Sequence, residues 1–242
     1  MISGMAEGME AGVGPAARDD GAAGWRARLG WAFGLVSDDP GERTAALAHL
    51  DGARKNVRAA CDRMNELWHL TSPLGPEEQY REPAFGRARE VYRDMCDRSL
   101  PEALWVGGDA LGPRLPYALL FLEWEARFPR EWTRHAKEWG TKQSLIRHVA
   151  AVDHDPPTRA KLVDLVEVVV HRAHRCKDRE YVRVARAVDG EDLRRRLDGA
   201  AASDNPWARL HAGYVLRLLD QPEVPNTRHV WRTWIRDASE TP

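Results

Sequence analysis

Apolar side chains recur every three or four positions along most of this chain, which is the spacing of an amphipathic α-helix. This pattern predicts a helix from about Pro40 to His69 and another from about Ala84 to Arg98. The longest pattern runs from Pro156 to about Val188 and includes VEVVVH, the only β-branched run. The residues around that run keep helical spacing, so a helix is favoured there over a strand.

Prolines mark the predicted helix starts. The same two-residue start occurs three times, as Asp39-Pro40, Asp155-Pro156 and Asn205-Pro206. An Asp or Asn side chain accepts hydrogen bonds from the free N–H groups of a first helical turn, and proline fits the first helical position because no backbone donor is needed there. Pro83, Pro101 and Pro129 stand in similar places.

These elements add up to about eight or nine helices, with no segment of convincing two-residue period. We therefore predict an all-α fold, either an irregular helical bundle or a short α-solenoid, because each amphipathic unit must stack on another to bury its apolar stripe. Residues 1–24 are dense in Gly and Ala and predict a disordered tail. Residues 25–242 are predicted to form one helical domain with a possible internal boundary near residues 141–155.

One segment resembles a known repeat family. Within NPWARLHAGYVLRLLD, the residues that carry the resemblance are Pro206, Arg209, Ala212, Leu216 and Leu219. The segment, mainly residues 203–220, resembles the first helix of a HEAT-type repeat, which implies a HEAT-like α-solenoid. The letters SDNPW, starting at Ser203, are also similar to the HEAT-like alkylpurine DNA glycosylases. That resemblance implies contact with DNA but assigns no catalytic residue here.

Composition narrows the function classes. The chain has 242 residues, 43% of them hydrophobic, and a formal net charge of −1, so bulk charge does not favour binding to polyanions. The apolar run LPYALLFL is too short to span a bilayer, and the N-terminus lacks the pattern of a secretory signal. Three widely spaced cysteines suggest reduced thiols. We expect a cytoplasmic bacterial protein without a membrane partner.

A row of arginines is the first candidate site. On one helix, Arg172, Arg175, Arg179, Arg183 and Arg186 would share a face, because they are spaced by three or four residues. Such a row can bind successive phosphates or an acidic protein. The alternative is a surface on which these side chains pair with acids of a neighbouring helix.

Glu167, His171 and His174 would also share a helical face and are weaker candidates for metal ligands. They do not form the His-Glu-x-x-His motif of zinc peptidases. Histidines on a half-buried helix end are the favoured interpretation, and we predict no metal and no other cofactor.

Tryptophan is frequent, with 10 residues in the chain. Trp124, Phe128, Trp132 and Trp139 are spaced by four or seven residues, and core packing is the favoured interpretation of this row. Trp231 and Trp234 lie near the C-terminus in HVWRTWIRD, where they could form an exposed docking face.

No nucleophile elbow, phosphate-binding loop or dinucleotide fingerprint is present. The favoured hypothesis is therefore a non-enzymatic interaction or scaffold protein that presents a helical surface to a protein partner through Trp231, Trp234 and the arginine row. The first alternative is a protein that binds nucleic acid through the arginine row, and a HEAT-like DNA glycosylase is one form of this alternative. The second is a metal-dependent helical enzyme.

Overall fold

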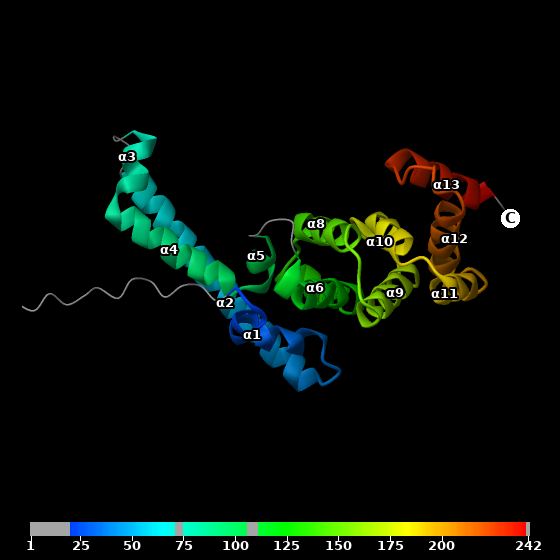
Figure 1. The fold of residues 1–242 in the computed structure, drawn as a ribbon, viewed down its shortest axis with the longest axis horizontal. Helices are drawn as coiled ribbons and strands as arrows, with labels where there is room; N and C mark the ends of the chain where they lie inside the picture. Colours follow the sequence, from blue (N-terminus) through cyan, green and yellow to red (C-terminus); the bar gives the residue numbers. More distant parts are fainter. Residues whose placement is uncertain (1–19, 71–74, 106–110, 241–242) are drawn as a thin grey trace, which may run out of the picture.

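The computed structural model describes residues 20–70, 75–105 and 111–240, and for residues 238–240 it describes the backbone only. These described parts contain thirteen α-helices and three short 3₁₀ helices and no strand (Figure 1). The predicted all-α fold is therefore confirmed, but the described residues form more α-helices than the eight or nine predicted. The HEAT-like solenoid stays a prediction. The α-helices are α1 (Ala22–Leu29), α2 (Pro40–Leu70), α3 (Pro76–Arg81), α4 (Pro83–Asp97), α5 (Leu100–Trp105), α6 (Leu115–Arg127), α7 (Pro129–His135), α8 (Trp139–Val149), α9 (Pro156–Val170), α10 (Tyr181–Ala187), α11 (Glu191–Ala201), α12 (Pro206–Asp220) and α13 (Arg228–Glu240). The 3₁₀ helices are η1 (Gly30–Val36), η2 (Gly112–Arg114) and η3 (Asp178–Glu180).

Five of the six proline-marked starts are confirmed, since α2, α4, α7, α9 and α12 each begin at the predicted proline, whereas α5 begins at Leu100, one residue before Pro101. At the start of α9, the Asp155 side chain accepts a hydrogen bond from the backbone N–H of Thr158 at 2.9 Å. At the start of α12, Asn205 accepts one from the backbone N–H of Trp207 at 3.0 Å. These caps satisfy donors that a helix leaves open at its first turn.

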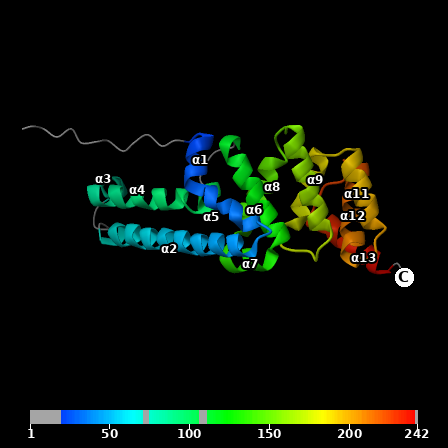
Figure 2. The same ribbon diagram turned by 90° about the horizontal axis from the view of Figure 1, so that it is seen from below.

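Helices α2 and α4 form a long hairpin that projects from the rest of the molecule, with α3 at its far end (Figures 1 and 2). An aromatic cluster holds that far end together, because the ring of Trp68 lies 5.3 Å from the rings of both Tyr80 and Phe85. Toward the other end, Leu50 and Val57 of α2 are buried. The hairpin is thus anchored to the body by one end and closed by aromatic packing at the other.

Helix α6 lies at the centre of the body, beside α5, α8 and α9 (Figure 1). Trp124 and Trp132 are fully buried there, whereas Phe128 and Trp139 are partly buried and pack against the same core. The rings of Trp132 and Trp139 lie 4.7 Å apart. The interpretation of this aromatic row as core is therefore confirmed.

One apolar core connects residues on both sides of the possible boundary near residues 141–155, since it includes Trp132 before that segment, Ile146 within it and Leu162 after it. At the N-terminus, α1 begins at Ala22 and buries Gly24 and Trp25. The predicted tail is therefore too long at its C-terminal end, because residues 22–24 belong to helix α1, which packs through the buried Trp25. Residues 1–19 of that predicted tail lie outside the described residues.

The prediction of one helix from Pro156 to about Val188 is wrong. Helix α9 ends at Val170, a turn follows, and the chain resumes in η3 and α10. Lys177 adopts a left-handed backbone conformation with φ of 69°, and the carboxylate of Asp178 accepts a hydrogen bond from the backbone N–H of Arg175 at 2.7 Å. The helix breaks because this turn brings Asp178 into a buried group of charged side chains, described below.

Helix α13 packs on α12 through its two tryptophans. The indole N–H of Trp234 donates a hydrogen bond to the carbonyl of Leu210 at 2.9 Å. A Cβ atom at Gly213 would lie 3.1 Å from the Trp234 ring, so glycine at that position permits the close approach. The ring of Trp231 lies 4.7 Å from that of Tyr214. Both tryptophans are only partly exposed, so they contribute to the fold and leave little indole surface for the predicted docking face.

Candidate functional site

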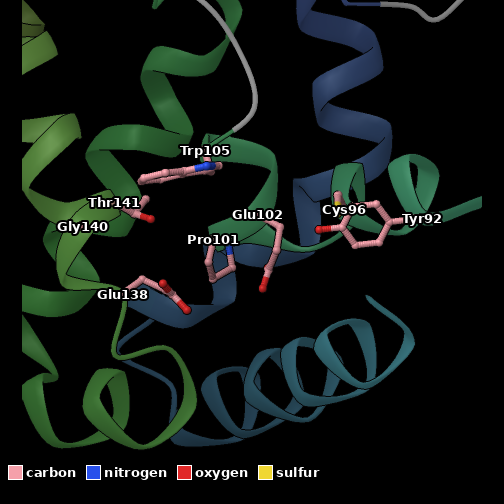
Figure 3. Close-up of a pocket in the computed structure, with 8 residues that line it drawn as sticks. All are labelled: Tyr92, Cys96, Pro101, Glu102, Trp105, Glu138, Gly140 and Thr141. Atoms are coloured by element: carbon pink, nitrogen blue, oxygen red, sulfur yellow. The ribbon is translucent and has the colours of Figure 1, made fainter. Parts of the chain in front are cut away.

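A pocket of about 320 Å³ lies where the hairpin of α2 and α4 meets the body (Figure 3). Residues from α4, α5 and the start of α8 surround it. Its lining consists of Tyr92, Cys96, Pro101, Glu102, Trp105, Glu138, Gly140 and Thr141. The pocket is hence built from segments that are far apart in the sequence.

Two glutamates place negative charge in this pocket, and both bind Arg54 of α2. The Nε atom of Arg54 lies 3.2 Å from a carboxylate oxygen of Glu102, and its Nη2 atom donates to Glu138 at 2.8 Å. Figure 3 shows both carboxylates directed toward α2. Among the described ion pairs, Arg54 is their shared cation, so the two carboxylates exceed it by one negative charge. The partial positive charge at the N-terminus of α8 offsets about half of that excess.

Trp105 forms one wall of the pocket, and 66% of its surface is exposed. The indole ring lies over Gly140, where a Cβ atom would be 3.7 Å from the ring (Figure 3). Most tryptophans in the described chain are buried or half-buried, whereas this one offers a ring to solvent beside two carboxylates. The wall is consequently a flat aromatic surface in an acidic setting.

Tyr92 and Cys96 close the pocket at α4, and both keep their protons at neutral pH. The hydrogen bond with the Cys96 side chain, followed by burial, raises the pKa of Tyr92 to about 12. Burial raises the pKa of the Cys96 thiol, and the nearby carboxylates of Glu102 and Asp97 raise it further, although the hydrogen bond with Tyr92 acts in the opposite direction. This thiol is therefore a poor nucleophile, since thiolate is the reactive form.

The sequence did not identify this pocket. Glu102 and Trp105 follow the predicted start at Pro101 and are three residues apart, so a shared helical face was the available signal. Glu138 is far from Glu102 and Trp105 in the sequence. It lies in the same pocket because Arg54 of α2 binds both Glu102 and the segment after α7 that contains Glu138. The Arg54 guanidinium donates to the carbonyls of His135 and Ala136 at 2.6 and 3.0 Å.

The arginine row is not one surface, because the helix that was to carry it is broken. Arg172 and Arg175 turn inward and contact the fully buried Glu125 of α6 at 2.8 and 3.0 Å. Lys142, also fully buried, contacts Glu125 at 2.9 Å and Asp178 at 2.6 Å. For these two arginines the structure matches the alternative of pairing with acids of a neighbouring helix.

Of the other three arginines in the row, Arg183 and Arg186 also make side-chain contacts within the fold. Arg183 pairs with Glu180 at 3.0 Å, and Arg186 donates to the carbonyl of Leu218 at 3.0 Å. Arg179 has one guanidinium nitrogen, Nη1, that is closed off from solvent without a hydrogen-bond partner. The five guanidinium groups thus do not share one face, and their role in binding phosphates or a protein stays a prediction.

The three metal-ligand candidates are also separated by the end of α9. Glu167 pairs with Arg196 at 2.6 Å, and His171 donates from Nδ1 to the carbonyl of Glu167 at 2.9 Å. His174 lies in the following turn, where its ring stacks on Trp231 at 5.1 Å. In the parts of the chain that the structure describes, no group of three His, Cys, Asp or Glu side chains is placed to hold a metal ion.

No family model, curated protein or solved structure matches this chain. None of the described helices combines the length and the apolar character needed to cross a bilayer.

Proposed function

We propose that this protein is an interaction protein whose pocket beside Trp105 receives a basic side chain of a protein partner. The observation that carries the proposal is the exposed indole of Trp105 in one pocket with Glu102 and Glu138. Trp231 and Trp234, which the sequence suggested as docking residues, are less suited to that role because both pack on α12.

The physical argument begins with the indole ring. A cation over a tryptophan face gains about 0.5–2 kcal/mol, the larger value where water is excluded. Glu102 and Glu138 exceed their shared partner Arg54 by one negative charge, about half of which remains after the α8 N-terminus is counted. An arginine fits best because its planar guanidinium can stack on the indole while donating to a carboxylate.

Binding is favoured over catalysis in this pocket by the protonation of its side chains. Cys96 and Tyr92 are held in their neutral forms, so they supply no thiolate or phenolate at neutral pH. Nucleic-acid binding is also less favoured, because an acidic pocket repels phosphates and the arginine row lacks a common face. A partner with an exposed arginine satisfies both the charge and the shape of the site.

The proposal is tested by calorimetry with two tripeptides, acetyl-Gly-Arg-Gly-amide and the same peptide with citrulline in place of arginine. Citrulline keeps the shape but loses the charge. We expect saturable binding of the arginine peptide, with Kd on the order of 1 mM. Glu138→Gln is expected to weaken it about tenfold, roughly 1.4 kcal/mol.

Glu223→Gln is the matched control, since it removes the same charge from an exposed residue between α12 and α13. These two helices lie at the end of the body that is away from the hairpin (Figure 1). This control variant should bind the arginine peptide as the wild type does. Equal binding of the arginine and citrulline peptides, or equal weakening by both substitutions, would contradict the proposal.

A further inference from the structure

A second, smaller cavity of about 30 Å³ lies where α9, α10, α12 and α13 meet. Apolar side chains form much of it, and the remainder is aromatic or polar. Its aromatic, polar and charged lining residues are His174, Asp178, Arg179, Tyr181, His211, Tyr214 and Trp231. About 10–15 Å³ suffices for one water, so the space holds roughly two waters or the two oxygens of one carboxylate group.

Two nearly buried residues of this lining have polar atoms without a partner. Tyr181 is 3% exposed, and its hydroxyl has no hydrogen-bond partner in the described parts of the chain. His211 is 7% exposed, and its Nε2 atom likewise has none. Because Nδ1 of His211 faces the carbonyl of Val170 at 3.3 Å, Nδ1 carries the proton in the neutral ring and Nε2 is an acceptor. Buried polar atoms are nearly always paired, so these two point to a missing ligand.

The surroundings of the cavity are positively charged. Lys142, Arg172 and Arg175 face only two carboxylates, Glu125 and Asp178, which leaves one surplus positive charge. Asp178 borders the cavity, but its two oxygens are already occupied by Lys142 and by the backbone N–H of Arg175. Arg179 lines the cavity, and its Nη1 atom is shielded from solvent and has no hydrogen-bond partner among the described residues. An anion is the ligand that this set of donors lacks.

We propose that this cavity binds the carboxylate group of a small organic acid. The Tyr181 hydroxyl and the Arg179 guanidinium donate to the carboxylate, and His211 takes up one proton from solvent at Nε2 and then donates as well. Binding is thus linked to uptake of a proton. The stacked rings of His174 and Trp231 border the same cavity and cover its ligand.

The test is calorimetric titration with sodium acetate, compared with acetamide, its neutral isostere. We expect saturable binding of acetate and none of acetamide. Because one proton is taken up on binding, acetate affinity should rise toward tenfold for each unit that the pH falls through the range where His211 is neutral. Absence of saturable acetate binding, as expected if only water fills the cavity, would overturn the proposal, and so would equal binding of acetamide.

Two matched variants distinguish binding of acetate in this cavity from a general effect of losing a tyrosine hydroxyl. Tyr181→Phe removes the unpartnered hydroxyl and should weaken acetate binding at least fivefold. Tyr214→Phe removes a hydroxyl from the same lining, but that hydroxyl already donates to Asn226 at 3.0 Å, so acetate affinity should stay unchanged. Thermal unfolding verifies that both variants fold. Equal acetate affinity in wild type and Tyr181→Phe would overturn the assignment, and Trp105→Ala should leave acetate binding intact because the two pockets are separate.

Discussion

At the scale of single residues, the most consequential feature is the buried group around Lys142. The Nζ atom lies within 2.9 Å of Glu125 and 2.6 Å of Asp178, and it donates to the carbonyl of Cys176 at 3.2 Å. Removal of one partner from such a group leaves a buried charge without one of its ion-pair contacts. The group thereby fixes the turn after α9 against α6 and α8.

We expect Lys142→Met to lower the free energy of unfolding by about 3–5 kcal/mol, because it removes the fully buried cation that contacts both Glu125 and Asp178 and leaves those carboxylates without that ion-pair partner. Lys161→Met is the matched control. Lys161 pairs with Glu123 at 2.6 Å, but its side chain is 44% exposed, so the loss should be under about 1 kcal/mol. Denaturant titration measures both losses, and similar values would show that burial of the group is not the cause.

At the scale of helices, the sequence predicted the helix ends that depend on nearby residues. It did not predict the helix end that depends on a contact with a distant residue. Proline and a capping side chain predicted the starts of α2, α9 and α12 correctly, since both act within one turn. The end of α9 at Val170 was missed because no glycine or proline marks it. That break depends on Asp178 reaching Lys142, which the sequence separates from it by 36 residues.

The packing of α13 on the body should weaken in acid. Burial lowers the pKa of His174 and of His211 below the ordinary 6.5, and for His211 the neighbouring His174 lowers it further. The folded protein therefore binds fewer protons than the unfolded chain just below pH 6.5. The stability contributed by the two neutral rings is complete above pH 6.5 and is lost as the pH falls below it through the folded-state pKa values.

Denaturant unfolding between pH 7.5 and 5 in acetate-free buffer measures this loss. Asp178 favours protonation of both rings and Arg172 opposes it, while Lys142 and Arg179 also oppose protonation of His174. His211→Gln should reduce the pH dependence, whereas His229→Gln, at an exposed position of α13, should preserve it. The same pH dependence in both variants would refute the assignment to His211.

At the scale of the whole molecule, the hairpin of α2 and α4 projects from a helical body, and the pocket beside Trp105 lies at their junction (Figures 2 and 3). Helical content, helix starts and the buried aromatic row followed from the sequence. The pocket did not, since Arg54, Glu102 and Glu138 meet only when the hairpin packs on the body. A partner bound there would contact both parts of the molecule at once.

The most direct test of the central claim is the indole N–H signal of Trp105 in a nitrogen-15 NMR spectrum, assigned by its loss in Trp105→Phe. We predict that acetyl-Gly-Arg-Gly-amide shifts this signal in a saturable manner, while the citrulline peptide leaves it in place. An unchanged Trp105 signal at saturating arginine peptide, or the same shift with both peptides, would contradict the account.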